Sequence, residues 1–190
     1  MRKQKGFSLI ELLIVVAIIL IIAAIAIPNL LRAKISANES SAVGSVRNII
    51  TAEASYSSAY PEYGFAKNLL GLGQNGGANC ANGPDPVAGA CYLDTVLAAT
   101  ANPIKSGYYF EATADNQDLV ADPNGIKAYH GFTIAAVPAV FNQTGVRAFC
   151  AGDDGVLRQV PNSGGTYKGA GVSLDTWDVV CTVNPWAVLQ

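Results

Sequence analysis

Hydrophobic positions dominate the first part of the chain. From residue 7 to residue 27 every residue is apolar except Ser8 and Glu11. A helix of about 20 apolar residues is long enough to cross the hydrocarbon core of a bilayer. The run therefore predicts a membrane-spanning helix over residues 7–27.

Beyond this run the apolar residues form one stripe along a helix that is otherwise polar. They recur at steps of three or four residues, or at sums of these, which places them on one face. Polar residues between them, Glu39 and Glu53 included, are expected to lie mostly off that face. Pro61 is expected to end the helix, because the residue before a proline avoids the α conformation. The stripe comprises Leu31, Ile35, Ala42, Val46, Ile49, Tyr56 and Tyr60.

The remainder of the chain predicts a loop followed by strands. Residues 60–103 are rich in Gly, Asn and Pro and show no sustained period, which is typical of a surface loop. Within it, residues 93–101 are interpreted as a short helix. Asp153, Asp154 and Gly155 form a turn signal between two apolar runs. The predicted strands are residues 107–113, 129–137, 146–151, 156–160 and 179–183.

These elements predict an α+β fold. An antiparallel sheet of about four strands is expected to pack on the amphipathic half of the long N-terminal helix, and the first half of that helix is expected to span a membrane. The predicted division is a leader at 1–6, the helix at 7–59 with its transmembrane part at 7–27, and a head at 60–190, with a connecting loop at 60–103 and the sheet at 104–190.

Charge adds an orientation to this picture. The net charge of the 190 residues is −2, so the overall balance does not suggest a nucleic-acid-binding protein. Basic residues are unevenly placed, because Arg2, Lys3 and Lys5 directly precede the apolar run. A basic flank of this kind predicts that residues 1–6 stay on the cytoplasmic side and that the rest lies across the membrane.

The chain has four cysteines, Cys80, Cys91, Cys150 and Cys181. An even number behind an export-type N-terminus favours disulfides formed in an oxidising compartment. Three pairings are possible, and Cys80–Cys91 with Cys150–Cys181 is preferred because each closes the shorter loop. Free buried thiols remain the alternative. A zinc ribbon is disfavoured, because no C-x-x-C pair occurs.

The N-terminal run has two simple interpretations. A secretory signal peptide fits the small residues of Ala24-Ile25-Ala26, but the run exceeds the roughly 7–15 apolar residues typical of such signals. A plain membrane anchor fits the length and leaves Glu11 without a role. A charge deep in a membrane costs about 2.5–3.5 kcal/mol or more, so its default interpretation is functional. Alternatively, Glu11 reaches the nearby interface.

A third interpretation rests on the residues around this carboxylate. Gly6 ends a short basic leader, Phe7 follows it, Glu11 stands four positions later, and Pro28 closes the apolar run. This combination resembles the N-terminal signal of prepilins in the type IV pilin superfamily. The resemblance is strongest over about the first 30 residues. It implies the same α+β layout, with a disulfide-bounded region near the C-terminus.

The resemblance also implies roles for these residues. A prepilin peptidase is expected to cut between Gly6 and Phe7, and the new Phe7 amine is expected to be N-methylated. Glu11 is expected to pair with the Phe7 amine of a neighbouring subunit during assembly, which would neutralise two charges in an apolar setting. Pro28 is expected to mark a segment of the helix that unwinds in the filament.

The function implied is that of a structural subunit. The expected partners are other copies of the chain in a homopolymeric filament, the prepilin peptidase with the inner-membrane assembly machinery, and membrane lipid before assembly. The precursor is expected in the inner membrane and the filament outside the cell, where it supports adhesion, motility or DNA uptake. The alternatives are a type II secretion pseudopilin forming a periplasmic piston, and an exported protein with an ordinary signal or anchor.

The sequence offers little for catalysis or for a cofactor. His130 is the only histidine, and no G-x-S-x-G, H-E-x-x-H or P-loop pattern occurs. We expect His130 to be a packed or surface residue and the chain not to be an enzyme. Asp175 and Asp178 are weak calcium candidates, and solvated turn carboxylates are the favoured interpretation. No cofactor, metal site or nucleic-acid contact is predicted.

Overall fold

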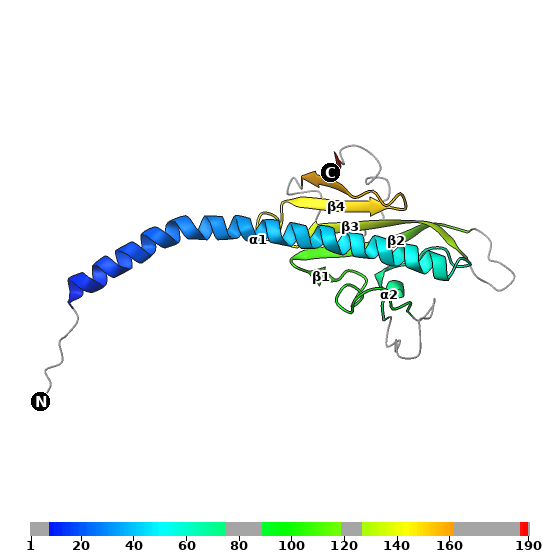
Figure 1. Ribbon diagram of the computed structural model, residues 1–190, viewed down its shortest axis with the longest axis horizontal. Helices are drawn as coiled ribbons and strands as arrows, with labels where there is room; N and C mark the ends of the chain where they lie inside the picture. Colours follow the sequence, from blue (N-terminus) through cyan, green and yellow to red (C-terminus); the bar gives the residue numbers. More distant parts are fainter. Residues whose placement is uncertain (1–7, 75–88, 119–126, 162–186, 190) are drawn as a thin grey trace, which may run out of the picture.

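The computed structural model describes residues 8–74, 89–118, 127–161 and 187–189. Its dominant element is the helix α1 (Leu9–Ala59), which extends far beyond the rest of the molecule (Figure 1). Only the second half of α1 lies against the sheet, so one helix joins a bare apolar stalk to a packed head.

The head is built on one antiparallel sheet whose strands follow chain order, so every connection joins neighbouring strands. A short helix, α2 (Leu69–Leu72), lies between α1 and the sheet in the sequence. The α+β class predicted from the sequence is therefore confirmed. The strands are β1 (Ile104–Lys105), β2 (Tyr108–Gln117), β3 (Tyr129–Pro138), β4 (Arg147–Gly152), β5 (Arg158–Pro161) and β6 (Ala187–Val188).

Among the described residues the sheet has six strands where about four were expected, because β1 and β6 are two-residue edge strands with no detectable sequence period. The predicted strand at 179–183 lies outside the described residues. α2 was not predicted either. Its start is stabilised by Asn68, whose side-chain oxygen accepts the N–H of Gly71 at 3.1 Å.

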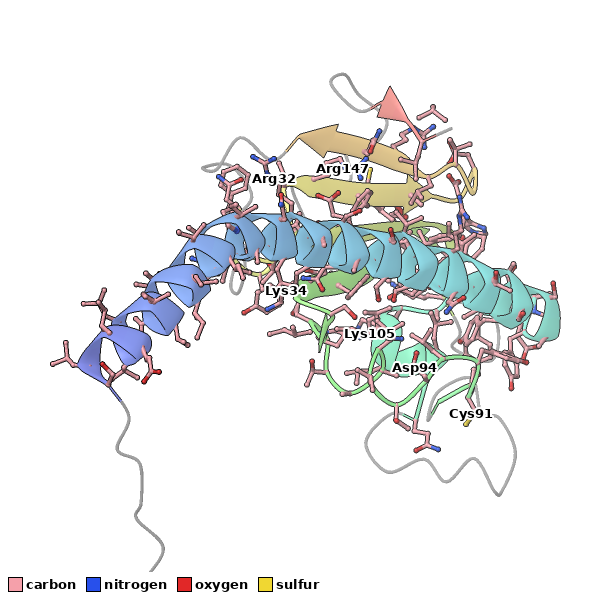
Figure 2. All side chains as sticks on the ribbon, turned by 60° about the vertical axis from the view of Figure 1, so that its left-hand side comes forward. Arg32, Lys34, Cys91, Asp94, Lys105 and Arg147 are labelled. Atoms are coloured by element: carbon pink, nitrogen blue, oxygen red, sulfur yellow. The ribbon has the colours of Figure 1, made fainter. Side chains whose placement is uncertain are left out.

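The short helix expected at 93–101 is wrong, because this stretch forms only a turn. The Asp94 carboxylate accepts the backbone N–H groups of Val96 and Leu97, at 2.9 and 3.1 Å. The same side chain pairs with Lys105 of β1, on the side of α1 where Cys91 also lies (Figure 2). Asp94 caps the start of this turn, and Pro103 disfavours the α conformation at Asn102.

The core lies between the second half of α1 and one face of the sheet. The α1 stripe contributes Ala42, Val46, Ile49 and Tyr56, all buried as the spacing predicted. Leu31 remains exposed and Ile35 half-buried, because contact with the head begins near Asn38, whose amide donates to the Thr144 carbonyl at 2.9 Å. The sheet and α2 supply Tyr108, Phe110, Phe132, Ile134, Phe149, Leu69 and Leu72.

The close approach of β2 to the turn before β4 generates a test. A Cβ on Gly145 would lie 2.0 Å from the hydroxyl oxygen of buried Tyr108, which itself donates to the Arg147 carbonyl at 2.8 Å. Gly145→Ala should therefore lower the free energy of unfolding by about 1–3 kcal/mol. The measurement is urea unfolding of the full chain in detergent.

Gly44→Ala is the matched control. Gly44 lies inside α1, and nothing is within 4 Å of a Cβ placed there. The exchange should raise the free energy of unfolding by about 0.5–1 kcal/mol, because alanine loses less backbone entropy in a helix. Equal effects of the two substitutions would contradict the packing described around Tyr108.

Candidate functional site

The predicted assembly site lies where α1 begins. The Glu11 carboxylate turns back along the helix and accepts the backbone N–H of Ser8 at 2.9 Å through Oε2. Such a bond satisfies one of the orphan donors of a helix N-terminus and places negative charge at its positive end. Gly6 and Phe7, the predicted cleavage and methylation residues, lie outside the described residues.

The first half of α1 exposes its apolar side chains all round. Large hydrophobic residues are exposed from Leu9 to Leu31 without a head contact to cover them. In the described part of the chain, one helix is long and apolar enough to cross a membrane, judged by length and composition, and it is α1. A bare apolar surface of this extent needs lipid or another protein around it.

Pro28 lies inside this apolar half, and α1 continues through it without a break. Proline has no backbone N–H, so the helix loses one hydrogen bond there, and its ring crowds the preceding turn. The isolated chain is therefore helical at Pro28. Unwinding the helix there would break one backbone hydrogen bond fewer than elsewhere. The unwinding role stays a prediction.

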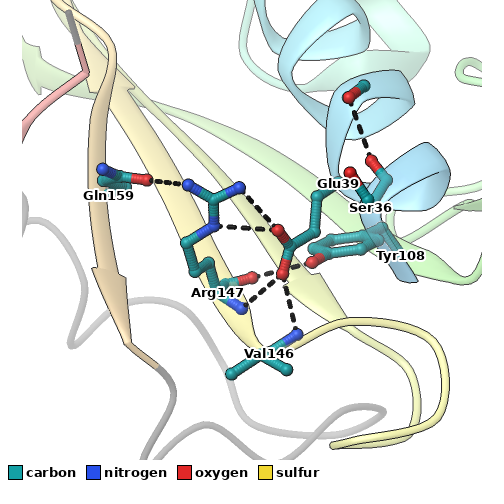
Figure 3. Close-up of polar contacts among 7 residues, drawn as sticks. Ser36, Glu39, Tyr108, Val146, Arg147 and Gln159 are labelled. Atoms are coloured by element: carbon teal, nitrogen blue, oxygen red, sulfur yellow. Dashed lines mark hydrogen bonds and ion pairs between the residues drawn. The ribbon is translucent and has the colours of Figure 1, made fainter. Parts of the chain in front are cut away.

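A partly buried ion pair fastens α1 to the sheet close to the point where the helix meets the head (Figure 3). Glu39 on α1 accepts the Arg147 guanidinium through Oε2, from Nε at 2.8 Å and Nη2 at 2.6 Å. Its Oε1 accepts the backbone N–H groups of Val146 and Arg147, at 3.0 and 3.1 Å. Gln159 of β5 orients the guanidinium from its other side at 2.8 Å.

The environment of Glu39 favours its charged form. Burial by itself raises the pKa of this carboxyl, but hydrogen bonds from the Arg147 side chain and from two backbone N–H groups outweigh burial and lower the pKa. The Glu39 side chain is 8% exposed and that of Arg147 43% exposed. The pair therefore links the start of the packed half of α1 to the first residue of β4 as a charged contact.

A second glutamate on the same helix face, Glu53, is buried in its neutral form, whereas Glu39 is charged. Glu53 is fully buried, and Oε2 accepts the N–H of Ala66 at 2.9 Å, whereas Oε1 has no partner among the described residues. Burial raises the pKa of this carboxyl from 4.5 to about 8, against the smaller effect of the Ala66 bond. Glu53 is therefore protonated at neutral pH.

The expectation that Glu39 and Glu53 lie off the stripe is wrong. With them included, the helix face reads 39, 42, 46, 49, 53, 56 and 60, which alternates steps of three and four residues without a gap. The spacing of Glu39 and Glu53 indicated that they lie on the buried face, but a charged residue type argued against it. A glutamate is almost never fully buried unless it is paired or neutral, and these two residues fulfil one condition each.

The cysteine predictions are tested only in part. Cys91 and Cys150 are both in disulfides, so neither is a free thiol. Cys80 and Cys181 lie outside the described residues. The preferred pairing, Cys80–Cys91 with Cys150–Cys181, therefore stays a prediction.

His130 lies on the surface, where its Nε2 contacts the Asp118 carboxylate at 2.8 Å. This hydrogen bond lowers the pKa of Asp118. Both side chains are more than 40% exposed, which suits a surface ion pair better than a catalytic one. Within the described ranges no three His, Cys, Asp or Glu side chains gather as metal ligands. Asp175 and Asp178 lie outside those ranges.

Comparison with known proteins points to one family. Residues 1–27 match the family model described as the prokaryotic N-terminal methylation motif. The chain is 32% identical over 130 residues to the type IV major pilin protein PilA of Myxococcus xanthus, a match covering 66% of this chain and 58% of that protein. It is 67% identical over 39 residues to the type IV wide pilus major component PilA4 of Thermus thermophilus, covering 20% and 30%.

The matched part spans less than two thirds of the length of either relative. No solved structure matches the chain significantly. The similarity to named pilins therefore rests on sequence, most densely on the N-terminal segment.

The Glu39–Arg147 pair predicts a marked loss of stability when its cation is removed. Arg147→Met keeps the aliphatic stem but leaves the buried carboxylate without its counter-charge. The free energy of unfolding at neutral pH should fall by about 1.5–3 kcal/mol, and the loss should shrink in acid as Glu39 becomes protonated. Lys105→Met, which breaks the more exposed pair with Asp94, should cost at most about 1 kcal/mol. The measurement is the free energy of urea unfolding of both variants at several pH values. Equal losses in the two variants would contradict the special role of Arg147.

Glu53 predicts that the head is less stable in alkaline solution. Its folded pKa of about 8 lies above the ordinary 4.5, so its contribution is complete below about pH 4.5. Between these values the free energy of unfolding should fall by roughly 1.4 kcal/mol per pH unit because of this group. Glu53→Gln cannot titrate, so the difference between the wild type and this variant should follow that slope and level off above about pH 8. A constant difference across this range would show that Glu53 ionises freely in the fold.

Proposed function

We propose that this chain, which belongs to the type IV pilin superfamily, is the structural subunit of a type IV pilus. The observation that carries the proposal is the apolar half of α1, most of which lies within the methylation motif of residues 1–27 and which no other described part of the chain covers. Identical helices from other subunits would cover that surface in a filament. Both relatives described above are named as major pilus components, which supports a pilus rather than a secretion piston.

Processing comes first in the proposed sequence of events. A prepilin peptidase cuts between Gly6 and Phe7 and removes Arg2, Lys3 and Lys5 with the leader. Gly6 has no side chain, so a protease can approach its carbonyl closely. The cut leaves a free α-amine on Phe7, which is then methylated.

Assembly then exchanges one partner of Glu11 for another. In the single chain the carboxylate accepts the Ser8 N–H at 2.9 Å, a hydrogen bond that holds the first turn of α1. In the filament it pairs with the Phe7 amine of the adjacent subunit, which neutralises both charges away from water. Because the amine lies at a fixed position on each subunit, this pairing also sets the axial register.

The remaining features fit a building block rather than an enzyme. The subunit waits in the inner membrane with α1 inserted, and the assembly machinery lifts it into a filament at the cell surface. Pro28 marks where α1 unwinds as subunits pack. The Glu39–Arg147 pair keeps the head fixed to the helix during this transfer, since it ties β4 to α1 directly. No catalytic role is proposed for His130 or for any other residue.

The test separates the charge of Glu11 from its hydrogen bond. Glu11→Gln keeps an oxygen that accepts the Ser8 N–H but carries no charge, whereas Glu11→Ala loses both. Mass spectrometry should show chains that begin at a methylated Phe7 in both variants, because the scissile residues are unchanged. Filament yield by electron microscopy should fall sharply in both. Glu62→Gln, at an exposed glutamate of the head, should leave the yield unchanged.

One result would overturn the proposed function, and two others would overturn only the charge-pairing role of Glu11. A mature chain beginning near Ile27 would establish an ordinary secretory signal. Normal filaments from Glu11→Gln would show that the carboxylate acts only as a helix cap. Full filament loss confined to Glu11→Ala would lead to the same conclusion.

A further inference from the structure

The neck of the molecule, residues 32–37, is the exposed stretch of α1 between the apolar half and the head. It carries two cations, Arg32 and Lys34, both exposed (Figure 2). Neither forms an ion pair with another described residue. The proposed function gives these two charges no role.

No acidic residue lies close to them along α1. Between Glu11 and Glu39 the sequence contains no Asp or Glu, and Glu39 is occupied by Arg147. The neck is therefore purely cationic, in a chain whose net charge is −2. A local excess of this kind fits an anionic partner outside the chain.

The placement of the two cations around the helix favours a partner that surrounds it. Residues two positions apart lie about 200° apart around an α-helix, so Arg32 and Lys34 point to nearly opposite sides. A protein docking on one face would meet only one of them. A layer of headgroups around the helix would meet both, and phosphate is the group that arginine and lysine bind best in such a layer.

The position of Arg32 along the helix axis also agrees with a layer of lipid headgroups as the partner. From Leu9 to Leu31 the exposed apolar surface is about 33 Å long at 1.5 Å per residue, close to the roughly 30 Å of a hydrocarbon core. Glu11 and Arg32 are separated by about 32 Å along the same helix. Both charges can therefore reach an interface at once, and sliding by one turn would draw one of them into hydrocarbon.

Resting on the proposed function, we propose that Arg32 and Lys34 form a collar that binds the phosphates of the outer lipid headgroups and fixes the depth of the membrane-inserted subunit. Leader removal strengthens the dependence on this collar, because it deletes Arg2, Lys3 and Lys5 from the inner side. The mature helix then has its side-chain cations at the outer interface alone. The next cation on α1, Arg47, lies about 22 Å beyond Arg32, outside the reach of the surface at physiological salt.

The experiment uses the mature subunit, purified from cells and reconstituted into vesicles of phosphatidylcholine and phosphatidylglycerol in phosphate-free buffer. Arginine is labelled with ¹³C at Cζ, and solid-state NMR measures dephasing of that signal by lipid ³¹P. The label enters Arg32 and three arginines of the head, Arg47, Arg147 and Arg158. We expect dephasing in the wild type, its loss in Arg32→Gln, and its retention in Arg47→Gln. The same measurement with ¹⁵N at the lysine Nζ should lose its signal in Lys34→Gln and retain it in Lys127→Gln.

Absence of dephasing in inserted wild type would overturn the collar, as would dephasing that survives Arg32→Gln. Filament loss in Arg32→Gln/Lys34→Gln, without wild-type dephasing in vesicles, would instead assign the pair to an acidic surface on a neighbouring subunit. These results are independent of the Glu11 test. Normal filaments with no phosphorus contact would remove the collar alone, and phosphorus contact in a chain that never polymerises would remove the filament proposal alone.

Discussion

The stripe from Glu39 to Tyr60 organises the head, because the core lies between this stripe and one face of the sheet. Alternating steps of three and four residues keep it on one helix face over 22 residues. Two carboxylates interrupt the apolar seam, and each removes the penalty of burial differently. Glu39 stays charged and is fully hydrogen-bonded with Arg147, whereas Glu53 loses its charge. The first contact fixes α1 to β4, and the second joins it to the segment leading into α2.

The same helix leaves its first half without an intramolecular partner, and it remains helical because its backbone hydrogen bonds are internal. The apolar side chains of this half cannot be buried within the helix itself. Lipid tails and the side chains of neighbouring helices offer nearly equal apolar surroundings, so moving from one to the other changes the hydrophobic free energy little. A chain of this design can therefore be stored in a membrane and later packed among copies of itself.

The sequence predicted those parts of the structure that depend on periodicity. The long apolar run and the following stripe imply a helix in two environments, and the short runs separated by turn residues from residue 107 onward imply strands, which together give the α+β fold. Prediction failed where one contact outweighs the pattern. The stretch after Asp94 closes only one turn, β1 and β6 are too short to show a period, and Glu39 and Glu53 were misplaced because residue type was weighed above spacing. The motif indicated that Glu11 is functional, but the sequence could not show that its carboxylate accepts the Ser8 N–H.

Charge, rather than apolar area, must then decide where the subunit resides. If hydrocarbon and filament are nearly equivalent for the apolar side chains, the difference between the two states lies in Glu11, the Phe7 amine, Arg32 and Lys34. In the membrane these groups sit at two interfaces about 32 Å apart, each with water or phosphate to bind. In the proposed filament Glu11 would gain the amine of a neighbour, while Arg32 and Lys34 would leave the headgroups. Extraction therefore breaks the phosphate contacts at the neck and draws Glu11 through hydrocarbon before its new partner is reached. On the proposed function, that order would place an electrostatic barrier between two apolar environments, and an inserted subunit would stay in the membrane until work is supplied to lift it.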